Sequence, residues 1–167
     1  MVRKARSAAG DMAVDGSQWK RVLSPKSQES GTLSEHPPDA LWVRVYYEDT
    51  DFSGRVYHAS YLRFLERGRT EWLRRRGFAH RDLAERSGVM FVVRSLQIEY
   101  LAAATMDDLL TVETSVATVR GASIEFKQRI SRSDKEIVTA DVLAASIRDG
   151  RPARIPADLR RRLQPPA

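Results

Sequence analysis

The apolar and polar positions that begin at Leu41 predict a strand followed by a long helix. Leu41–Tyr47 (LWVRVYY) is rich in β-branched and aromatic residues, which is typical of a strand. From Val56 or Tyr57 to Arg76, apolar residues recur at helical spacing, and Gly77 is placed to end the helix. We expect one buried helix face, made of Tyr57, Tyr61, Leu65, Gly68 and Trp72 and widened by Leu62 and Leu73.

The rest of the pattern predicts a short second helix and then four strands. Ala79–Ser87 precedes a glycine and has helical spacing. The alternating apolar segments that follow are Val89–Leu101, Leu109–Val119, Ser123–Ile130 and Glu136–Arg148. Short connections between them favour antiparallel hairpins, and a short helix is expected at Pro156–Leu163. The fold class is therefore α+β, with one long helix packed on an antiparallel sheet of about five strands.

The length and composition indicate one folded domain with extensions at both ends. A chain of 167 residues is long enough to bury a real core. Residues 1–39 are rich in Ser, Ala and Gly, and we predict a disordered extension that ends at Pro37–Pro38. Residues 40–150 are expected to form the folded domain, and residues 151–167 a basic tail.

The absence of cysteine excludes disulfides, thiolate catalysis and cysteine-based metal sites. No apolar run approaches the roughly 18 residues of a membrane span. The basic residues near the N-terminus are not followed by an apolar run, so they do not make a secretory signal. We therefore expect a cytoplasmic protein.

The net charge of +6 is unevenly distributed along the chain. Residues 151–167 carry five arginines and one aspartate, whereas residues 40–150 are nearly neutral. A nearly neutral domain argues against nucleic acid as a partner. The basic tail is either simply solvated or able to contact a phosphate or an anionic membrane surface.

Asp51 is the main candidate for a chemical role. It lies in a glycine-bearing turn just before the long helix, whose first turn presents unpaired N–H groups and partial positive charge. There the carboxylate should be ionised, and it can act as a nucleophile or as a general base on water. The helix N–H groups can polarise a carbonyl beside it. The competing interpretation is that Asp51 only caps the helix.

Three neighbouring features allow weaker interpretations. Glu48, Asp49 and Asp51 resemble a divalent-cation cluster, but a solvated loop explains them equally well, and we predict no metal. His58, in the first helical turn, can orient a carbonyl or hold the loop. Gly54 can admit a ligand close to the backbone or merely make the turn. GxGxxG, GxxxxGK[ST] and GxSxG patterns are absent, so neither a nucleotide-binding loop nor a serine nucleophile is indicated.

The block YYEDTDFSGRVYHASYLRFLERGRTEWL resembles the 4-hydroxybenzoyl-CoA thioesterase family of hotdog-fold proteins. Within that family it is most similar to the bacterial acyl-CoA thioesterases associated with the Tol–Pal system. The similarity covers about residues 41–160. One departure is Phe52–Ser53, where many relatives have smaller or proline-containing residues, which leaves the acyl specificity open.

The resemblance implies a long central helix wrapped by a curved antiparallel sheet, in a homodimer or homotetramer. It places the catalytic aspartate at Asp51, the turn glycine at Gly54 and the carbonyl-polarising amides at Tyr57 and His58. The implied reaction is hydrolysis of an acyl-CoA to free acid and CoA, with no cofactor. The alternatives are an acyl-thioester hydratase or dehydratase, whose D-x-N-P-x-H pattern is absent, and a non-catalytic or membrane-associated oligomeric binding protein.

Overall fold

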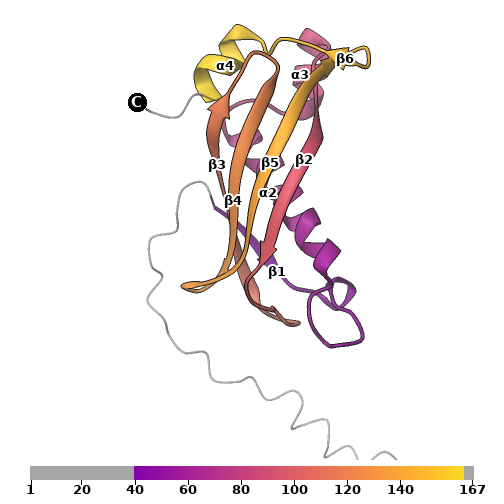
Figure 1. The fold of residues 1–167 in the computed structure, drawn as a ribbon, viewed down its shortest axis with the longest axis vertical. Helices are drawn as coiled ribbons and strands as arrows, with labels where there is room; N and C mark the ends of the chain where they lie inside the picture. The colour runs from indigo at the N-terminus through magenta and orange to yellow at the C-terminus, as the bar shows by residue number, and fades with distance from the viewer. Residues whose placement is uncertain (1–39, 164–167) are drawn as a thin grey trace, which may run out of the picture. The chain divides into compact units, whose positions relative to one another are not determined.

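The computed structural model describes residues 40–163, which form one long helix, an antiparallel sheet and short helices (Figure 1). The segment predicted to be disordered, 1–39, lies outside the described residues, as do residues 164–167. In chain order the elements are β1 (Leu41–Arg44), the 3-10 turn η1 (Tyr47–Asp49), α2 (His58–Arg75), α3 (His80–Ser87), β2 (Met90–Tyr100), β3 (Leu109–Val119), β4 (Ser123–Arg132), β5 (Lys135–Arg148), β6 (Arg151–Pro152) and α4 (Ala157–Leu163).

The sheet has the strand order β1-β3-β4-β5-β2, with β6 also paired to β5, and every pairing is antiparallel. Tight turns join β3, β4 and β5, as the short connections predicted. Strand β2 precedes β3 in the sequence but lies beside β5, in a register that runs from Met90↔Ile147 to Tyr100↔Val138. The predicted α+β class, with one helix on an antiparallel sheet, is confirmed.

Helix α2 buries one face against the sheet, and Figure 1 shows it crossing behind the strands. Tyr61, Leu65, Gly68, Trp72 and Leu73 are buried as predicted. The prediction was wrong for Tyr57 and Leu62, which are 43% and 38% exposed, because Tyr57 precedes the first helical residue and Leu62 lies at the edge of the face. Phe64, which the sequence analysis did not select, is fully buried beside Tyr61.

Gly68 lets the middle of α2 approach the sheet closely. A Cβ at this position would lie 2.7 Å from Cγ1 of Val112. Beside this contact the Gln128 amide donates to the Leu65 carbonyl at 2.9 Å and to Thr114 Oγ1 at 2.8 Å, and its oxygen accepts from Arg69 at 2.7 Å. These bonds satisfy a polar side chain that is buried between the helix and the sheet.

The first strand is shorter than the predicted Leu41–Tyr47. It ends at Arg44, and the chain then enters the 3-10 turn η1. The cause is local, because a carboxylate oxygen of Asp49 accepts the Tyr46 N–H at 3.0 Å and the Asp49 N–H donates to the Tyr46 carbonyl at 3.0 Å. Side-chain bonds of this kind compete with strand pairing.

The chain after Gly150 packs back onto the domain. Strand β6 was not predicted; it pairs with the end of β5. The predicted tail helix is present as α4, and its Leu159 and Leu163 are buried together with Ile155. The Ile155 N–H donates to the Gly121 carbonyl at 2.9 Å. Among the described residues, no helix is both long enough and apolar enough to span a membrane.

Candidate active site

The loop between η1 and α2 doubles back on itself and brings Asp51 to the start of the long helix. Thr50 and Val56 form an antiparallel bridge, and the Asp51 N–H donates to the Arg55 carbonyl at 3.0 Å. The Tyr57 N–H donates to the Asp49 carbonyl at 2.8 Å. These bonds hold the residues before and after the turn side by side, so the turn between them is fixed against the first residues of α2.

Gly54 is required at this turn by its backbone conformation. Its φ is +72°, in the left-handed region that L-residues rarely adopt, and its N–H donates to the Asp51 carbonyl at 2.9 Å. A Cβ at Gly54 would meet nothing within 4 Å. Steric crowding therefore does not explain this glycine, and its role in binding a substrate stays a prediction.

The Asp51 carboxylate is exposed and held by a single neighbour. Its Oδ1 accepts the Ser53 N–H at 2.8 Å and the Ser53 hydroxyl at 2.6 Å. These two bonds, with a small contribution from nearby His58, lower the pKa of Asp51 below its ordinary value. In the described part of the chain Oδ2 has no partner, so the side chain presents one free, ionised oxygen at neutral pH.

Asp51 does not cap the helix. The residue before the first turn of α2 is Tyr57, and no side chain caps this end of the helix. The capping interpretation of Asp51 is therefore wrong. The carboxylate is instead bonded two residues along its own loop, to Ser53.

The free amides at the start of α2 differ by one residue from the predicted pair. The Tyr57 N–H is engaged by the Asp49 carbonyl, which removes it as a donor to a substrate in this conformation. Across residues 40–163, the N–H groups of His58 and Ala59 find no acceptor, whereas Ser60 N–H bonds to the Tyr57 carbonyl at 2.8 Å. His58 and Ala59 therefore supply the two donors that a helix start leaves unpaired.

The three acids before the turn do not converge on one point. Asp49 is only 4% exposed and its carboxylate is bonded to the Tyr46 N–H, whereas Glu48 and Asp51 are exposed. The structural cause is the turn η1, which replaces the extended chain that would have put Asp49 and Asp51 on one face. Within residues 40–163, no group of three or more His, Asp or Glu side chains is placed to hold a metal ion.

Tyr100 and Ser53 are site residues that the sequence analysis did not select. The Tyr100 hydroxyl donates to the His58 carbonyl at 3.2 Å, and the two rings meet edge to face with centroids 6.4 Å apart. Burial raises the pKa of Tyr100, which keeps this hydroxyl protonated at neutral pH. The end of β2 is thereby tied to the first turn of α2. Only the tertiary pairing reveals this contact, since 42 residues separate Tyr100 from His58.

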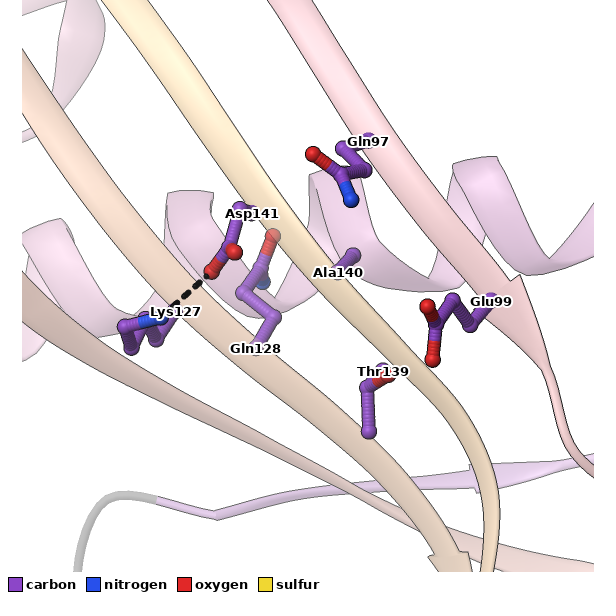
Figure 2. Close-up of a pocket in the computed structure, with 7 residues that line it drawn as sticks. All are labelled: Gln97, Glu99, Lys127, Gln128, Thr139, Ala140 and Asp141. Carbon is purple, nitrogen blue, oxygen red and sulfur yellow. Dashed lines mark hydrogen bonds and ion pairs between the residues drawn. The ribbon is translucent and has the colours of Figure 1, made fainter.

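A hollow with charged and polar lining lies on the face of the sheet turned away from α2 (Figure 2). It encloses about 280 Å³ over β2, β4 and β5, and the side chains that line it in Figure 2 include an ion pair between Lys127 and Asp141. The pair satisfies both charges, with 2.9 Å between Nζ and Oδ1. None of the residues between η1 and α2 lines this hollow. The candidate catalytic residues therefore remain those at the start of α2.

In this fold, a long helix lies on an antiparallel sheet, and the N–H groups at the start of the helix are unpaired beside an ionised carboxylate. The profile of the Thioesterase-like superfamily matches residues 45–163, and the chain belongs to this family. The hotdog architecture that the resemblance implied is confirmed by this match and by the solved structure described below.

Relatives in the family are similar over most of their length. The acyl-CoA thioesterase YbgC of Haemophilus influenzae is 48% identical over 120 residues, which cover 71% of this chain and 88% of the relative. The acyl-CoA thioester hydrolase YbgC of Escherichia coli O6:H1 is 49% identical over 107 residues, covering 63% of this chain and 78% of the relative. The crystal structure of the "Probable Thioesterase" of Bartonella henselae matches with a TM-score of 0.68 and 43% identity, over 70% of this chain and 98% of that one.

Proposed function

We propose that this protein is an acyl-CoA thioesterase, which hydrolyses the thioester to a free acid and CoA. The observation that carries the proposal is the free, ionised oxygen of Asp51 beside the unpaired amides of His58 and Ala59. A carboxylate and two N–H donors at one small site are what attack on a carbonyl requires. The names of the relatives in Haemophilus and Escherichia support the same reaction.

Two routes are open to the Asp51 carboxylate. As a base, Oδ2 takes a proton from water, the water oxygen bonds to the carbonyl carbon, and the C–S bond then breaks as CoA leaves with the proton from Asp51. As a nucleophile, Oδ2 bonds to the carbonyl carbon and expels the CoA thiolate, and water then cleaves the mixed anhydride. In both routes the amides of His58 and Ala59 stabilise the negative charge that develops on the carbonyl oxygen. A single turnover in H₂¹⁸O that leaves the isotope in Asp51 identifies the nucleophilic route with water attack on the aspartyl carbonyl, because the base route places the isotope only in the released acid.

Release of free thiol from acyl-CoA tests the proposed reaction. The chain has no cysteine, so a thiol-reactive dye reports only the CoA product. We expect release from at least one member of a panel of short aliphatic, long aliphatic and aromatic acyl-CoAs, and the panel then ranks the acyl groups. Absence of release from all of them, by a protein shown to be folded, would contradict the proposal and favour a binding protein.

The proposed reaction needs no cofactor, because CoA is part of the substrate. A hydratase or dehydratase would need a histidine and an acid on the α and β carbons. The described site instead has a carboxylate whose only bonded side chain is that of Ser53. A cytoplasmic location remains part of the proposal, supported by the absence of cysteine.

We also propose a homodimer, or a tetramer built from it, on the evidence of the outer edge of β2. This strand pairs with β5 on one side only. Met90, Val92 and Val93 on it are 48%, 42% and 52% exposed. Open strand edges with apolar side chains favour pairing with another strand, here that of a second copy. The molar mass in solution, measured by light scattering, tests this assembly.

The basic tail belongs to a larger group of arginines, which we call the arginine end. Figure 1 shows α3, α4 and β6 together at the end of the sheet opposite the Asp51 turn. Among the described residues, the exposed arginines there whose side chains make no ion pair or hydrogen bond are Arg81, Arg86, Arg120, Arg148, Arg151, Arg154, Arg160, Arg161 and Arg162, the last of which lies over the Phe78 ring. They outnumber the nearby carboxylates of Asp82, Glu85, Asp149 and Asp158. By contrast, Lys127, Arg129 and Arg132 on the sheet are all paired with acids.

We expect the arginine end to bind weakly to an anionic membrane surface. Each arginine near such a surface contributes about 1 kcal/mol, so removing three should weaken binding by roughly two orders of magnitude. In the variant, Arg148, Arg151 and Arg154 are each replaced by glutamine. In the control, Arg63 and Arg67 of α2 and Lys135 at the start of β5 are replaced by glutamine, which removes the same charge outside the arginine end.

Co-sedimentation with vesicles of phosphatidylglycerol and phosphatidylcholine measures this binding. The expected result is binding by the wild type and the control, loss in the variant, and weakening by salt. Equal binding by all three proteins, or no binding by the wild type, would rule out this surface as a membrane contact.

A further inference from the structure

Ser53 supplies both hydrogen bonds that the Asp51 carboxylate receives in the described part of the chain. Its N–H lies 2.8 Å and its hydroxyl 2.6 Å from the same oxygen, Oδ1. We propose that Ser53 is a positioning residue, which holds Oδ1 of Asp51 and thereby fixes Oδ2 as the atom that acts on the thioester. This inference rests on the proposed thioesterase function.

The geometry makes this arrangement specific. The terminal torsion of an aspartate is broad, so an exposed carboxylate ordinarily exchanges its two oxygens freely. Two donors that reach Oδ1 from one residue fix the plane of the carboxylate as well as its distance. The turn itself is set by the bond from the Gly54 N–H to the Asp51 carbonyl, so Ser53 is held in place independently of its side chain. The hydroxyl of Ser53 is therefore free to orient the carboxylate.

The chemical effect of Ser53 is orientation, with a cost in basicity. Donors to the ionised form lower the pKa of Asp51, and the Ser53 hydroxyl is the largest cause. A less basic carboxylate is a weaker base and a weaker nucleophile. The arrangement is useful only if the gain from a fixed Oδ2 exceeds this loss. Misplacement of a reacting group by about 1 Å can lower the rate by roughly 10²-fold, which is the scale of the loss that a fixed Oδ2 would avoid.

The test uses three variants that separate the hydroxyl from the backbone donor. Ser53→Ala removes the hydroxyl and keeps the N–H, Ser53→Thr keeps both donors, and Ser115→Ala removes a hydroxyl on the sheet far along the chain from the turn. At pH 7 Asp51 is ionised in all of them. We expect kcat of Ser53→Ala to fall about tenfold with little change in KM, by loss of orientation. Ser53→Thr and Ser115→Ala should stay near the wild type.

The pH dependence of kcat/KM is a second measurement, and a purely structural role of Ser53 would leave it unchanged. Loss of the hydroxyl raises the pKa of Asp51, so Asp51 of Ser53→Ala should become protonated at a higher pH than in the wild type. As the pH is lowered, kcat/KM of this variant should therefore begin to fall earlier than that of the wild type. Ser53→Thr should restore the wild-type profile. Thermal unfolding at each pH shows whether the protein is still folded.

Carbon NMR of the Asp51 carboxyl group measures the same change of pKa without any turnover. An upward shift in Ser53→Ala, together with the lowered kcat, supports the proposal. The proposal would be overturned if Ser53→Ala kept the wild-type kcat and lost kcat/KM at the same acid pH as the wild type. It would also be overturned if kcat fell in Ser53→Ala, the pH at which kcat/KM is lost did not change, and Ser53→Thr did not restore kcat. If the wild type releases no thiol, the proposed function fails, while the NMR titration still reports whether Ser53 holds the carboxylate.

Discussion

The Asp51→Asn variant is expected to hydrolyse acyl-CoA at least a hundredfold more slowly than the wild type while keeping its fold. Asparagine has nearly the same shape, and its oxygen can still accept both bonds from Ser53. The free Oδ2, however, is replaced by an NH₂ group, which can neither take a proton from water nor attack a carbonyl. Loss of a general base lowers a rate by about 10²–10⁴-fold.

Glu48→Gln is the matched control for this experiment. Glu48 is an exposed carboxylate three residues away and lies in η1, outside the turn that holds Asp51. We expect its thiol release to equal that of the wild type. Near-wild-type turnover by Asp51→Asn would refute both catalytic routes, and circular dichroism with thermal unfolding shows whether each protein is folded.

The Gly68→Ala variant is expected to be less stable than the wild type by about 1–3 kcal/mol, the usual cost of overpacking a core. Alanine is the better helix former by roughly 1 kcal/mol, so the substitution would stabilise an exposed helix. At Gly68 the added Cβ would lie 2.7 Å from Cγ1 of Val112, a short, branched and buried side chain that cannot move away. Either the helix must lift from the sheet or the strand must shift.

Urea unfolding at fixed protein concentration measures this change, since an oligomer makes stability depend on concentration. Arg63→Ala provides the control, because Arg63 is exposed on the same helix and the substitution adds no atom to the core. Its free energy of unfolding should stay within about 0.5 kcal/mol of the wild type. A stabilised Gly68→Ala would mean that α2 lies farther from β3 than described.

The sequence predicted the elements well wherever periodicity and turn residues agreed. Helix α2 and strands β2 to β5 fall within a few residues of the predicted ranges, because each has a long apolar pattern between clear breakers. The misses are local. The chain leaves β1 early because Asp49 bonds to Tyr46, and β6 has two residues, too few to show any pattern.

The site was predictable in its location but only partly in its contacts. The spacing of Asp51 and the helix start is visible in the sequence, because helix starts leave N–H groups unpaired. The engagement of Tyr57 by Asp49 and the tie between Tyr100 and His58 depend on how the loop folds back and on strand pairing. The sequence shows that Ser53 follows Asp51 by two residues, and a serine at that spacing can donate to the carboxylate. Which oxygen it bonds to could be seen only in the structure.

The packing of Ile155, Leu159 and Leu163 into the core has a consequence for biosynthesis. A ribosome makes the chain from its N-terminus, so these buried side chains emerge after the rest of the core. Strand β5, which must pair with β2, β4 and β6, is also made late. The long helix and the early strands therefore keep part of their apolar faces uncovered until β5 and α4 have been made. We therefore expect folding of this domain to finish only after residues 155–163 have emerged from the ribosome.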